Sequence, residues 1–543
     1  MKLNRDMFVG GGSLIWLASL FIAVAPPARA ETITPSWSKT IAGGLSRHFD
    51  GRSVAMDSGG DIYVAGFTTS PAGTAWSVMK MSGSGAPIWA TSYDGYPNSS
   101  SNTAAAYGVA LDGSGNAIVV GMEKTAVSLE DWLVRKYSPS GSLVWSESYN
   151  SEANNSDIAY GVAVNSSGAI AVVGGEFRGD IGEGYNWLVR KYNSSGILQW
   201  SRSYNNPETA NGADSASGCA FDRNGNLFVA GYTDNQDAGT GLDMMVAKYD
   251  ANGNVAWSRT YGRLTNDNEQ ATAVGADADG NCIVAVSADN NNSIPSTGTD
   301  WMIIKYDGSG NQLWASAYTG PTPDSNAGGT GGVDVPTSLV VDSRGNAVVA
   351  GREEYTDTAN VIFEHNNSRV LIFSPAGAIV SGTSYNDNYG WNEGFMGVTC
   401  NLWGDIVAVG NMDWPLLDTN PQWKRNLFLA GYHRSGWPSR PAPAAPPAVT
   451  GDARLNRNAF SPSRGQTLSV FVKAKSTSDV SIRVFTPSGR FIIKLDGIMP
   501  EIDGWREVVW DGNNSDGQQV SRGVCLINVM SEGFNRTLKV VIR

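Results

Sequence analysis

Cysteine and histidine are scarce in this sequence of 543 residues. It contains three histidines and four cysteines, Cys219, Cys282, Cys400 and Cys525. No two cysteines lie close together, so the paired spacing of a structural zinc site is missing. We expect small buried free thiols, with a Cys219–Cys282 bridge between neighbouring repeats as the alternative in an oxidising compartment.

Positive charge is also in short supply. The chain has 39 Lys and Arg against 51 Asp and Glu, a formal net charge of −12 at pH 7. Lys2 and Arg5 precede an apolar run at 14–24, and small residues at 28–30 suit a cleavage site, so residues 1–30 are predicted to be a secretory signal peptide. Without them the charge is −14, which argues against nucleic acid or an anionic membrane as partner.

Beyond the signal peptide, no stretch is apolar for long enough to cross a bilayer as a helix. We therefore expect no transmembrane segment after signal cleavage. The expected location is secreted, in the periplasm or on the outer surface of a bacterium.

What the sequence has in abundance is a repeat. Copies such as Lys191-Tyr-Asn-Ser-Ser-Gly196-Ile-Leu-Gln-Trp200 and Lys248-Tyr-Asp-Ala-Asn-Gly253-Asn-Val-Ala-Trp257 recur along the chain. Their tryptophans fall 52 to 57 positions apart and are Trp37, Trp89, Trp145, Trp200, Trp257 and Trp314. Because one strand position repeats, these residues are predicted to pack between or within structural units.

A second turn lies about 30 residues before each tryptophan, as in Asp112-Gly-Ser-Gly-Asn116 and Asp222-Arg-Asn-Gly-Asn226. Asp or Asn opens such turns by bonding to nearby backbone, and Gly supplies positive φ. Short runs rich in Val, Ile and Ala flank the turns, which indicates strands. Each period therefore predicts four antiparallel strands, the blade of a β-propeller.

The ends of the repeat suggest a closed ring. Seven first turns are present, and the seventh repeat has no fourth strand because the chain becomes rich in proline after Trp437. Trp37-Ser-Lys-Thr40 resembles a fourth strand with no repeat before it. We predict an all-β fold with a seven-bladed β-propeller at 31–437, in which the N-terminal strand completes blade seven and leaves no open sheet edge.

These repeats resemble the seven-bladed β-propeller repeats (SBBP type) of secreted bacterial proteins. The resemblance implies the fold and leaves the activity open, because propellers host many unrelated functions. The Trp element is also similar to the tryptophan-docking repeat of quinone-dependent dehydrogenases, but the cofactor-holding channel of that family is not recognisable here.

A proline-rich linker at 438–450 precedes a second predicted domain, 451–543. Alternating strands and turns such as Glu507-Val-Val-Trp-Asp-Gly512 predict a small Ig-like β-sandwich. It resembles the Ig-like domain of the flagellar hook-capping protein and the C-terminal sorting domains of type IX secretion, with Cys525 where the latter usually have Tyr. The resemblance implies a role in attachment or sorting.

Two groups of residues are candidates for binding. Acidic loop residues could recruit Ca²⁺, although they lack a recognised ligand spacing and a solvated acidic surface is the alternative; the candidates are Asp234, Asp237, Asp324 and Asp334. Tryptophans late in the chain follow no repeat position and could bind glycan or peptide, or cover the end of the ring; they are Trp391, Trp403, Trp414 and Trp423.

No catalytic residue is indicated, since no nucleophile elbow, phosphate loop or metal-binding His pair is present. The sequence favours a non-enzymatic interaction protein whose partner is a protein or glycan at the cell envelope. Two alternatives remain: a carbohydrate-active enzyme (glycosidase or lyase) using paired carboxylates on the variable loop face, and a lectin-like propeller.

Overall fold

A computed structural model gives the fold as two compact units, Met1–Pro438 and Ser439–Arg543. It describes residues 32–41, 48–70, 73–95, 102–125, 128–207, 212–235, 241–262, 268–289, 298–320, 333–356, 364–385, 393–414, 424–437, 453–457, 459–464, 466–472, 481–486, 491–495, 506–515, 517–531 and 534–543. Within these ranges the structure is all-β apart from one helical turn, Pro462–Arg464. No helix in the same ranges is long and apolar enough to cross a bilayer.

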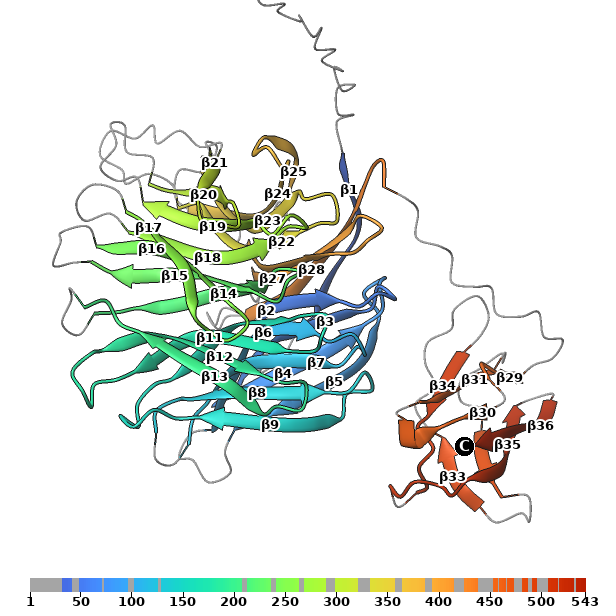
Figure 1. Ribbon diagram of the computed structural model, residues 1–543. Helices are drawn as coiled ribbons and strands as arrows, with labels where there is room; N and C mark the ends of the chain where they lie inside the picture. Colours follow the sequence, from blue (N-terminus) through green and yellow to red (C-terminus); the bar gives the residue numbers. More distant parts are fainter. Residues whose placement is uncertain are drawn as a thin grey trace, which may run out of the picture. The chain divides into compact units, whose positions relative to one another are not determined.

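The first unit consists of four-stranded antiparallel sheets, the arrangement expected of a propeller (Figure 1). The first three sheets contain β2 (His48–Met56), β3 (Ile62–Ser70), β4 (Gly73–Met81) and β5 (Pro87–Tyr93); β6 (Asn102–Leu111), β7 (Ala117–Glu123), β8 (Asp131–Tyr137) and β9 (Leu143–Tyr149); β10 (Ile158–Val164), β11 (Ile170–Phe177), β12 (Tyr185–Tyr192) and β13 (Leu198–Tyr204). A short parallel pairing of Gly73 and Thr74, at the start of the third strand β4, with β6 links the first two sheets.

Three further sheets follow the same pattern. They contain β14 (Ser215–Phe221), β15 (Leu227–Asp234), β16 (Leu242–Tyr249) and β17 (Val255–Tyr261); β18 (Glu269–Ala276), β19 (Cys282–Asp289), β20 (Thr299–Tyr306) and β21 (Gln312–Tyr318); β22 (Val335–Val341), β23 (Ala347–Thr356), β24 (Glu364–Phe373) and β25 (Ile379–Tyr385).

The last sheet of this unit joins the two ends of the repeat region. Its strands are β26 (Glu393–Cys400), β27 (Asp405–Trp414), β28 (Lys424–Arg434) and β1 (Ile33–Ile41), in that order. β1 pairs antiparallel with β28, and Trp37 lies opposite Gly431. The predicted pairing of the N-terminal strand with the end of the repeat is therefore confirmed.

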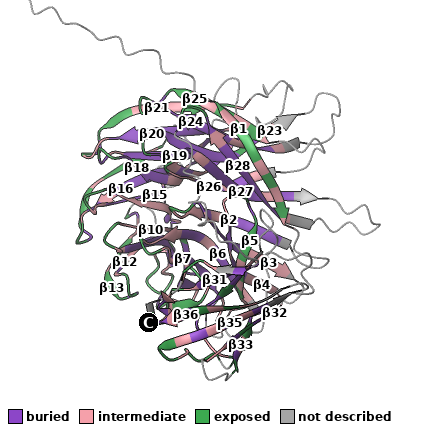
Figure 2. Ribbon diagram, turned by 90° about the vertical axis from the view of Figure 1, so that its right-hand side faces the viewer, coloured by how far each residue is buried: buried purple, intermediate pink, exposed green. Residues whose placement is uncertain are grey.

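Burial follows strand order within each sheet (Figure 2). The second strands are continuous apolar runs and are almost wholly buried, as in β7 and β11, because both of their faces meet neighbouring sheets. The fourth strands β9, β13 and β17 are mostly exposed. The core therefore lies between the sheets, which makes the contacts from one sheet to the next the main source of stability.

The repeated tryptophan fastens a sheet to the following one, except in the β22–β25 sheet, which has Ser381 at this position. Trp200 of β13 lies over Gly253 in the last turn of the next sheet, where a Cβ would come within 2.7 Å of the indole ring, and φ at Gly253 is +81°. The carbonyl oxygen of Ala251 in the same turn accepts hydrogen bonds from Trp200 Nε1 (3.1 Å) and Lys191 Nζ (2.9 Å). Glycine is thus needed here both for its positive φ and for the close approach of the ring.

The repeated lysine of the third strand also fastens its own sheet. Lys136 Nζ lies 2.8 Å from Asp112 Oδ2, and Lys305 Nζ lies 2.8 Å from Asp277 Oδ2. These aspartates open the first turn of each sheet, where their other oxygen accepts backbone N–H groups, such as that of Asn116 (2.9 Å). These lysines therefore hold the first turn of their own sheet and also reach the last turn of the next one, as Lys136 does through the carbonyl oxygen of Ser194 (3.0 Å).

Two sheets lack this lysine: Ile372 takes its place in the β22–β25 sheet and Gly431 in the last sheet. In the β22–β25 sheet the next sheet compensates. Arg434, at the end of β28 in the next sheet, fills the gap: its Nη1 lies 2.8 Å from Asp342 Oδ2, and neither side chain is exposed. Trp437 covers Arg434 and Arg344, whose guanidinium carbons lie 4.1 and 4.0 Å from the ring centroid.

The second unit contains two sheets that share one apolar core. One sheet has the order β29 (Ala453–Leu455), β31 (Leu468–Val472) and β34 (Arg506–Trp510), and the other β30 (Ala459–Phe460), β36 (Phe534–Ile542), β35 (Gly523–Ser531), β32 (Ser481–Phe485) and β33 (Phe491–Leu495). Phe460 and Trp510 meet edge to face at 5.6 Å, and Cys525 is buried among the core residues. All four cysteines of the chain are free thiols, as expected from their spacing.

Candidate functional site

Every first strand of the repeated sheets contains a β-bulge at the same place. The pairing with the second strand shifts between Ala106 and Gly108 in β6, and between Ala216 and Gly218 in β14. The bulged residue is always the fifth before the Asp or Asn that opens the first turn. We call this set the bulge ring; its members are Arg52, Tyr107, Tyr160, Ser217, Thr272, Thr337 and Met396.

Six of the seven bulges face a glycine in the partner strand. A Cβ on Gly121 would lie 2.0 Å from the carbonyl oxygen of Ala105, and one on Gly231 would lie 2.1 Å from that of Ser215. Equivalent glycines are Gly66, Gly174, Gly351 and Gly410, and only the β18–β21 sheet has another residue there, Val286. A bulge redirects one side chain, and at six of the bulges the glycine leaves room for the close approach of the bulged strand.

The residue after each bulge is small: Ser53, Gly108, Gly161, Gly218, Ala273, Ser338 and Gly397. A Cβ on Gly161 would lie 3.0 Å from Cα of Gly218, and one on Gly397 would lie 3.0 Å from Cα of Ser53. The first strands therefore approach one another closely here, and only small residues fit.

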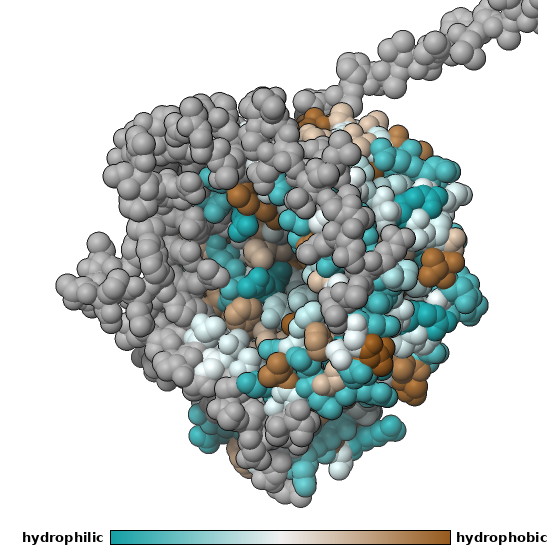
Figure 3. All heavy atoms as spheres, turned by 90° about the vertical axis from the view of Figure 1, so that its left-hand side faces the viewer, coloured by the Kyte–Doolittle hydropathy of each residue, from teal (hydrophilic) through white to brown (hydrophobic). Residues whose placement is uncertain are grey.

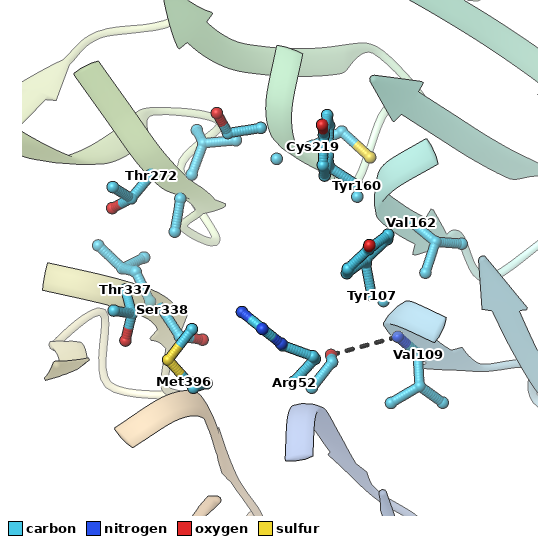
Figure 4. Close-up of a pocket in the computed structure, with 18 of the residues that line it drawn as sticks. Arg52, Tyr107, Val109, Tyr160, Val162, Cys219, Thr272, Thr337, Ser338 and Met396 are labelled. Atoms are coloured by element: carbon cyan, nitrogen blue, oxygen red, sulfur yellow. Dashed lines mark hydrogen bonds between the residues drawn. The ribbon is translucent and has the colours of Figure 1, made fainter. Parts of the chain in front are cut away.

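The bulge-ring residues line a cavity of about 470 Å³. The space-filling view shows a hollow at the centre of one face of the first unit (Figure 3). Arg52 reaches into the cavity, with Tyr107 on one side and Thr337 on the other (Figure 4). Among the described lining residues, Arg52 carries the only formal charge and no Asp or Glu is present. We call this cavity the central pocket.

Arg52 is held in place from behind. Its Nε lies 2.8 Å from Asp50 Oδ1, and its guanidinium carbon lies 5.2 Å from the ring centroid of Phe67. Asn411 of β27 fixes Asp50 in turn, because its Nδ2 donates to Asp50 Oδ1 (2.7 Å) while its Oδ1 accepts the N–H of Gly51 (2.9 Å). Asp50 is buried and does not line the pocket, so it orients the guanidinium without offering a charge to a ligand.

Tyrosines form an adjoining part of the wall. The rings of Tyr107 and Tyr160 lie 5.7 Å apart, and Tyr232 also lines the pocket. Burial raises the pKa of all three hydroxyls above the usual value of 10.0. They are therefore neutral at physiological pH and can donate hydrogen bonds. Cys219 lines the pocket as well, and burial raises the pKa of its thiol, so it is an unreactive apolar lining residue.

Buried carboxylates lie just before several first strands, but they bind backbone. Asp334 Oδ2 accepts the N–H of Gly320 (2.5 Å), and its Oδ1 accepts the N–H of Glu354 (2.8 Å). Asp157 binds the N–H groups of Ser151 and Phe177 in the same way. Their oxygens therefore hold loops to the ends of second strands, a role that the acidic composition of these loops did not reveal.

We expect these carboxylates to make stability depend on pH. Burial raises the pKa of Asp157 and of Asp334 from 3.8 to about 6. A raised pKa in the folded state favours folding below pH ~4, and this contribution is lost as the pH rises through 6. Urea unfolding at pH 4.5 and 7 should show a fall of roughly 1–3 kcal/mol for each residue. Asp157→Asn cannot ionise and should flatten the profile; an unchanged profile would contradict this account.

The predicted metal candidates are not brought together in the described part of the chain. Asp234 and Asp334 are both buried, and Asp237 and Asp324 lie outside the described residues. Within the described ranges no group of three or more His, Cys, Asp or Glu residues is placed to hold a metal ion.

The predicted tryptophan patch is only partly described. Trp391 and Trp423 lie outside the described residues, and Trp414 ends β27. Trp403 is half-buried in the first turn of its sheet, where its backbone N–H donates to Asn401 Oδ1 (2.9 Å). The patch therefore stays a prediction. The bulge ring was missed, although aligning the repeats shows a uniformly small residue that follows a highly variable one.

Comparison with known proteins agrees with the repeat. The family model for the SBBP β-propeller repeat matches residues 199–237. No curated protein matches the sequence.

Similar solved structures are distant. A protein of unknown function from Dyadobacter fermentans is 11% identical over 74% of this chain and 99% of its own (TM-score 0.40). PorZ, a surface component of the type IX secretion system of Porphyromonas gingivalis, is 12% identical over 90% and 74% (TM-score 0.27). An α-L-arabinanase from Penicillium chrysogenum is 10% identical over 59% and 91% (TM-score 0.36). With TM-scores below 0.5, none of them bears on what this chain binds. From the repeat match and its four-stranded antiparallel sheets, the chain is a β-propeller repeat protein.

Proposed function

We propose that the protein is a secreted or cell-surface interaction protein without enzymatic activity, and that it binds its ligand in the central pocket. The observation that carries the proposal is the bulge ring. Sheet after sheet turns one residue inward, and these residues differ in kind while the residues after them stay small. A conserved frame with varied inward side chains suits recognition of a specific ligand.

The proposal includes the domain organisation. The first unit would be a closed seven-bladed propeller over 31–437, with β1 completing the seventh blade. The close approach of Gly397 to Ser53 supports closure, since these residues belong to the last and first of the repeated first strands. Residues 1–30 would be a signal peptide, 438–450 a linker, and 451–543 an Ig-like domain for attachment or sorting at a bacterial surface.

The enzymatic alternative finds less support in the central pocket. A glycosidase needs two carboxyl groups facing the bond to be cleaved. The described residues that line the pocket include no carboxyl group. In the buried Asp157 and Asp334, both carboxylate oxygens accept hydrogen bonds from backbone N–H groups. The lectin-like alternative differs in place, because it would use the tryptophans near 391–423.

An array of glycans and peptides, probed with the secreted chain in the presence and absence of Ca²⁺, tests the proposal. Ser217→Tyr should abolish binding, because the large side chain would fill the pocket. The fold should accept it, since two neighbouring repeats have tyrosine at this position, Tyr107 and Tyr160. The ligand should be recovered unchanged by mass spectrometry. Binding lost instead in Trp414→Ala/Trp423→Ala would favour the lectin-like alternative, and a cleaved ligand would favour the enzyme.

A further inference from the structure

We propose that the central pocket binds the carboxylate-bearing sugar of an acidic oligosaccharide, a uronate, with Arg52 on the carboxylate. This inference rests on the proposed binding function and adds the chemical class of the ligand. Three features of the pocket lead to it: its charge, the state of its hydroxyl groups and its size.

The one formal charge on the described residues of the pocket wall is positive, although Asp50 pairs with it from behind. The chain has a net charge of −12, yet the only charged group among the described lining residues is the guanidinium of Arg52. Asp50 uses the Nε and Nη2 edge of that group, at 2.8 and 3.3 Å. Nη1 has no hydrogen-bond partner among the described residues and is left for a ligand. A carboxylate is the acceptor that suits a fixed guanidinium best.

The hydroxyl groups divide the wall into two parts. Thr337 donates to the carbonyl oxygen of Phe395 (2.6 Å) and Thr272 to that of Ala285 (3.3 Å), so both hydroxyls are committed to the backbone. Ser53 and Ser338 accept backbone N–H groups and keep their own protons available. The two threonines, Ser338 and Met396 lie on one side of the pocket, facing Tyr107 and Tyr160 (Figure 4), and of the described residues on that side only Ser338 has a hydroxyl proton free.

The opposite side offers donors and aromatic faces. Tyr160 is 39% exposed, and the hydroxyls of Tyr107 and Tyr160 are neutral at pH 7, since even the ordinary tyrosine pKa of 10.0 lies well above it. Neither tyrosine hydroxyl has a hydrogen-bond partner among the described residues. A sugar ring has hydroxyls at its edge and an apolar C–H face, which matches donors beside tyrosine rings and an opposite side of Thr and Met.

The size limits the ligand to a short one. The volume of about 470 Å³ lies in the lower part of the range of small-molecule sites, roughly 300–1,000 Å³. This suits one or two sugar rings, so a polysaccharide would be held by its end. A single guanidinium already paired with Asp50 also predicts modest affinity, with discrimination between charged and neutral sugars as its signature.

Isothermal titration of the full secreted chain with galacturonate and digalacturonate tests this inference. We expect digalacturonate to bind roughly 10- to 100-fold more tightly than the neutral digalactose, the range for a hydrogen bond to a charged group. Arg52→Gln should remove that difference. The matched control is Arg223→Gln, which loses the same charge from an exposed turn residue. Tyr160→Phe, which removes one hydroxyl and keeps the ring, should weaken both sugars alike.

Several outcomes would overturn the inference. One is equal binding of charged and neutral sugars, and another is no binding of uronates at millimolar concentration. A third is binding that does not change in Arg52→Gln and Ser217→Tyr variants whose thermal unfolding matches wild type. The last is tighter binding of 4-hydroxybenzoate than of any uronate. If a peptide or neutral glycan from the array still binds and Ser217→Tyr abolishes it, the proposed function stands and only the ligand class is wrong. If nothing binds, both fail.

Discussion

Replacing Gly121 by alanine should cost at least about 3 kcal/mol of unfolding free energy, above the usual range for overpacking. The added Cβ would lie 2.0 Å from the carbonyl oxygen of Ala105 and 2.9 Å from its carbonyl carbon. Both atoms belong to the backbone of the bulged strand, so relief requires the bulge to move rather than a side chain to turn. Because Tyr107 sits at that bulge, ligand binding in the central pocket should weaken as well.

Gly113→Ala is the matched control for this prediction. Gly113 lies in the first turn of the same sheet, and a Cβ there would meet nothing within 4 Å. We expect a change within about 0.5 kcal/mol, as for surface substitutions in general. Urea unfolding of both variants measures the difference. If Gly121→Ala were as stable as Gly113→Ala, the bulge would be soft, and the argument that it fixes the pocket residues would fail.

Replacing Arg434 by methionine should destabilise the protein by about 3–5 kcal/mol, because it leaves a buried charge without its partner. Neither side chain of the Arg434–Asp342 pair is exposed, and Nη1 lies 2.8 Å from Oδ2. The packing of Arg434 against Trp437 is lost in the same variant. Since Arg434 belongs to the last sheet, which contains β26, β27, β28 and β1, the substitution should also loosen that sheet.

Lys248→Met provides the comparison within the repeat. Lys248 Nζ lies 3.5 Å from Asp222 Oδ2, a longer and slightly more exposed pair, so its loss should cost clearly less. Denaturant unfolding gives the free energies of unfolding, and limited proteolysis measures how readily the sheet of β26, β27, β28 and β1 opens. A loss below about 1 kcal/mol for Arg434→Met, the value typical of surface pairs, would mean that the pair does not hold the two sheets together.

The sequence predicted the framework well because the framework repeats. The Asp-Gly turns, four strands to a sheet and the pairing of Trp37-Ser-Lys-Thr40 with the last strand could each be found from spacing alone. A turn must satisfy its own backbone locally, so its residues reveal it. The role of Arg434 could not be predicted from the sequence. It supplies the positive charge that the lysine would supply at position 372, and the two positions lie far apart in the sequence.

The pocket was harder to predict for a related reason. A bulge inserts one unpaired residue without altering the period, so the alternation of the first strands conceals it. The sequence pointed instead to unusual residues, the tryptophans near 391–423 and acids such as Asp334. Asp334 holds a loop by accepting hydrogen bonds from backbone N–H groups. This role depends on where the residue lies in the fold, and no sequence motif reveals it.

The central claim is that the inward-turned residues of the bulge ring form a ligand site. A crystal structure of the secreted chain with digalacturonate tests it most directly. We predict an intact saccharide in the central pocket, with a carboxylate oxygen within about 3 Å of Arg52 Nη1. An empty pocket with the saccharide bound elsewhere, in a protein whose array ligands also bind unaffected by Ser217→Tyr, would contradict the claim. A cleaved saccharide in the pocket would contradict the non-enzymatic role.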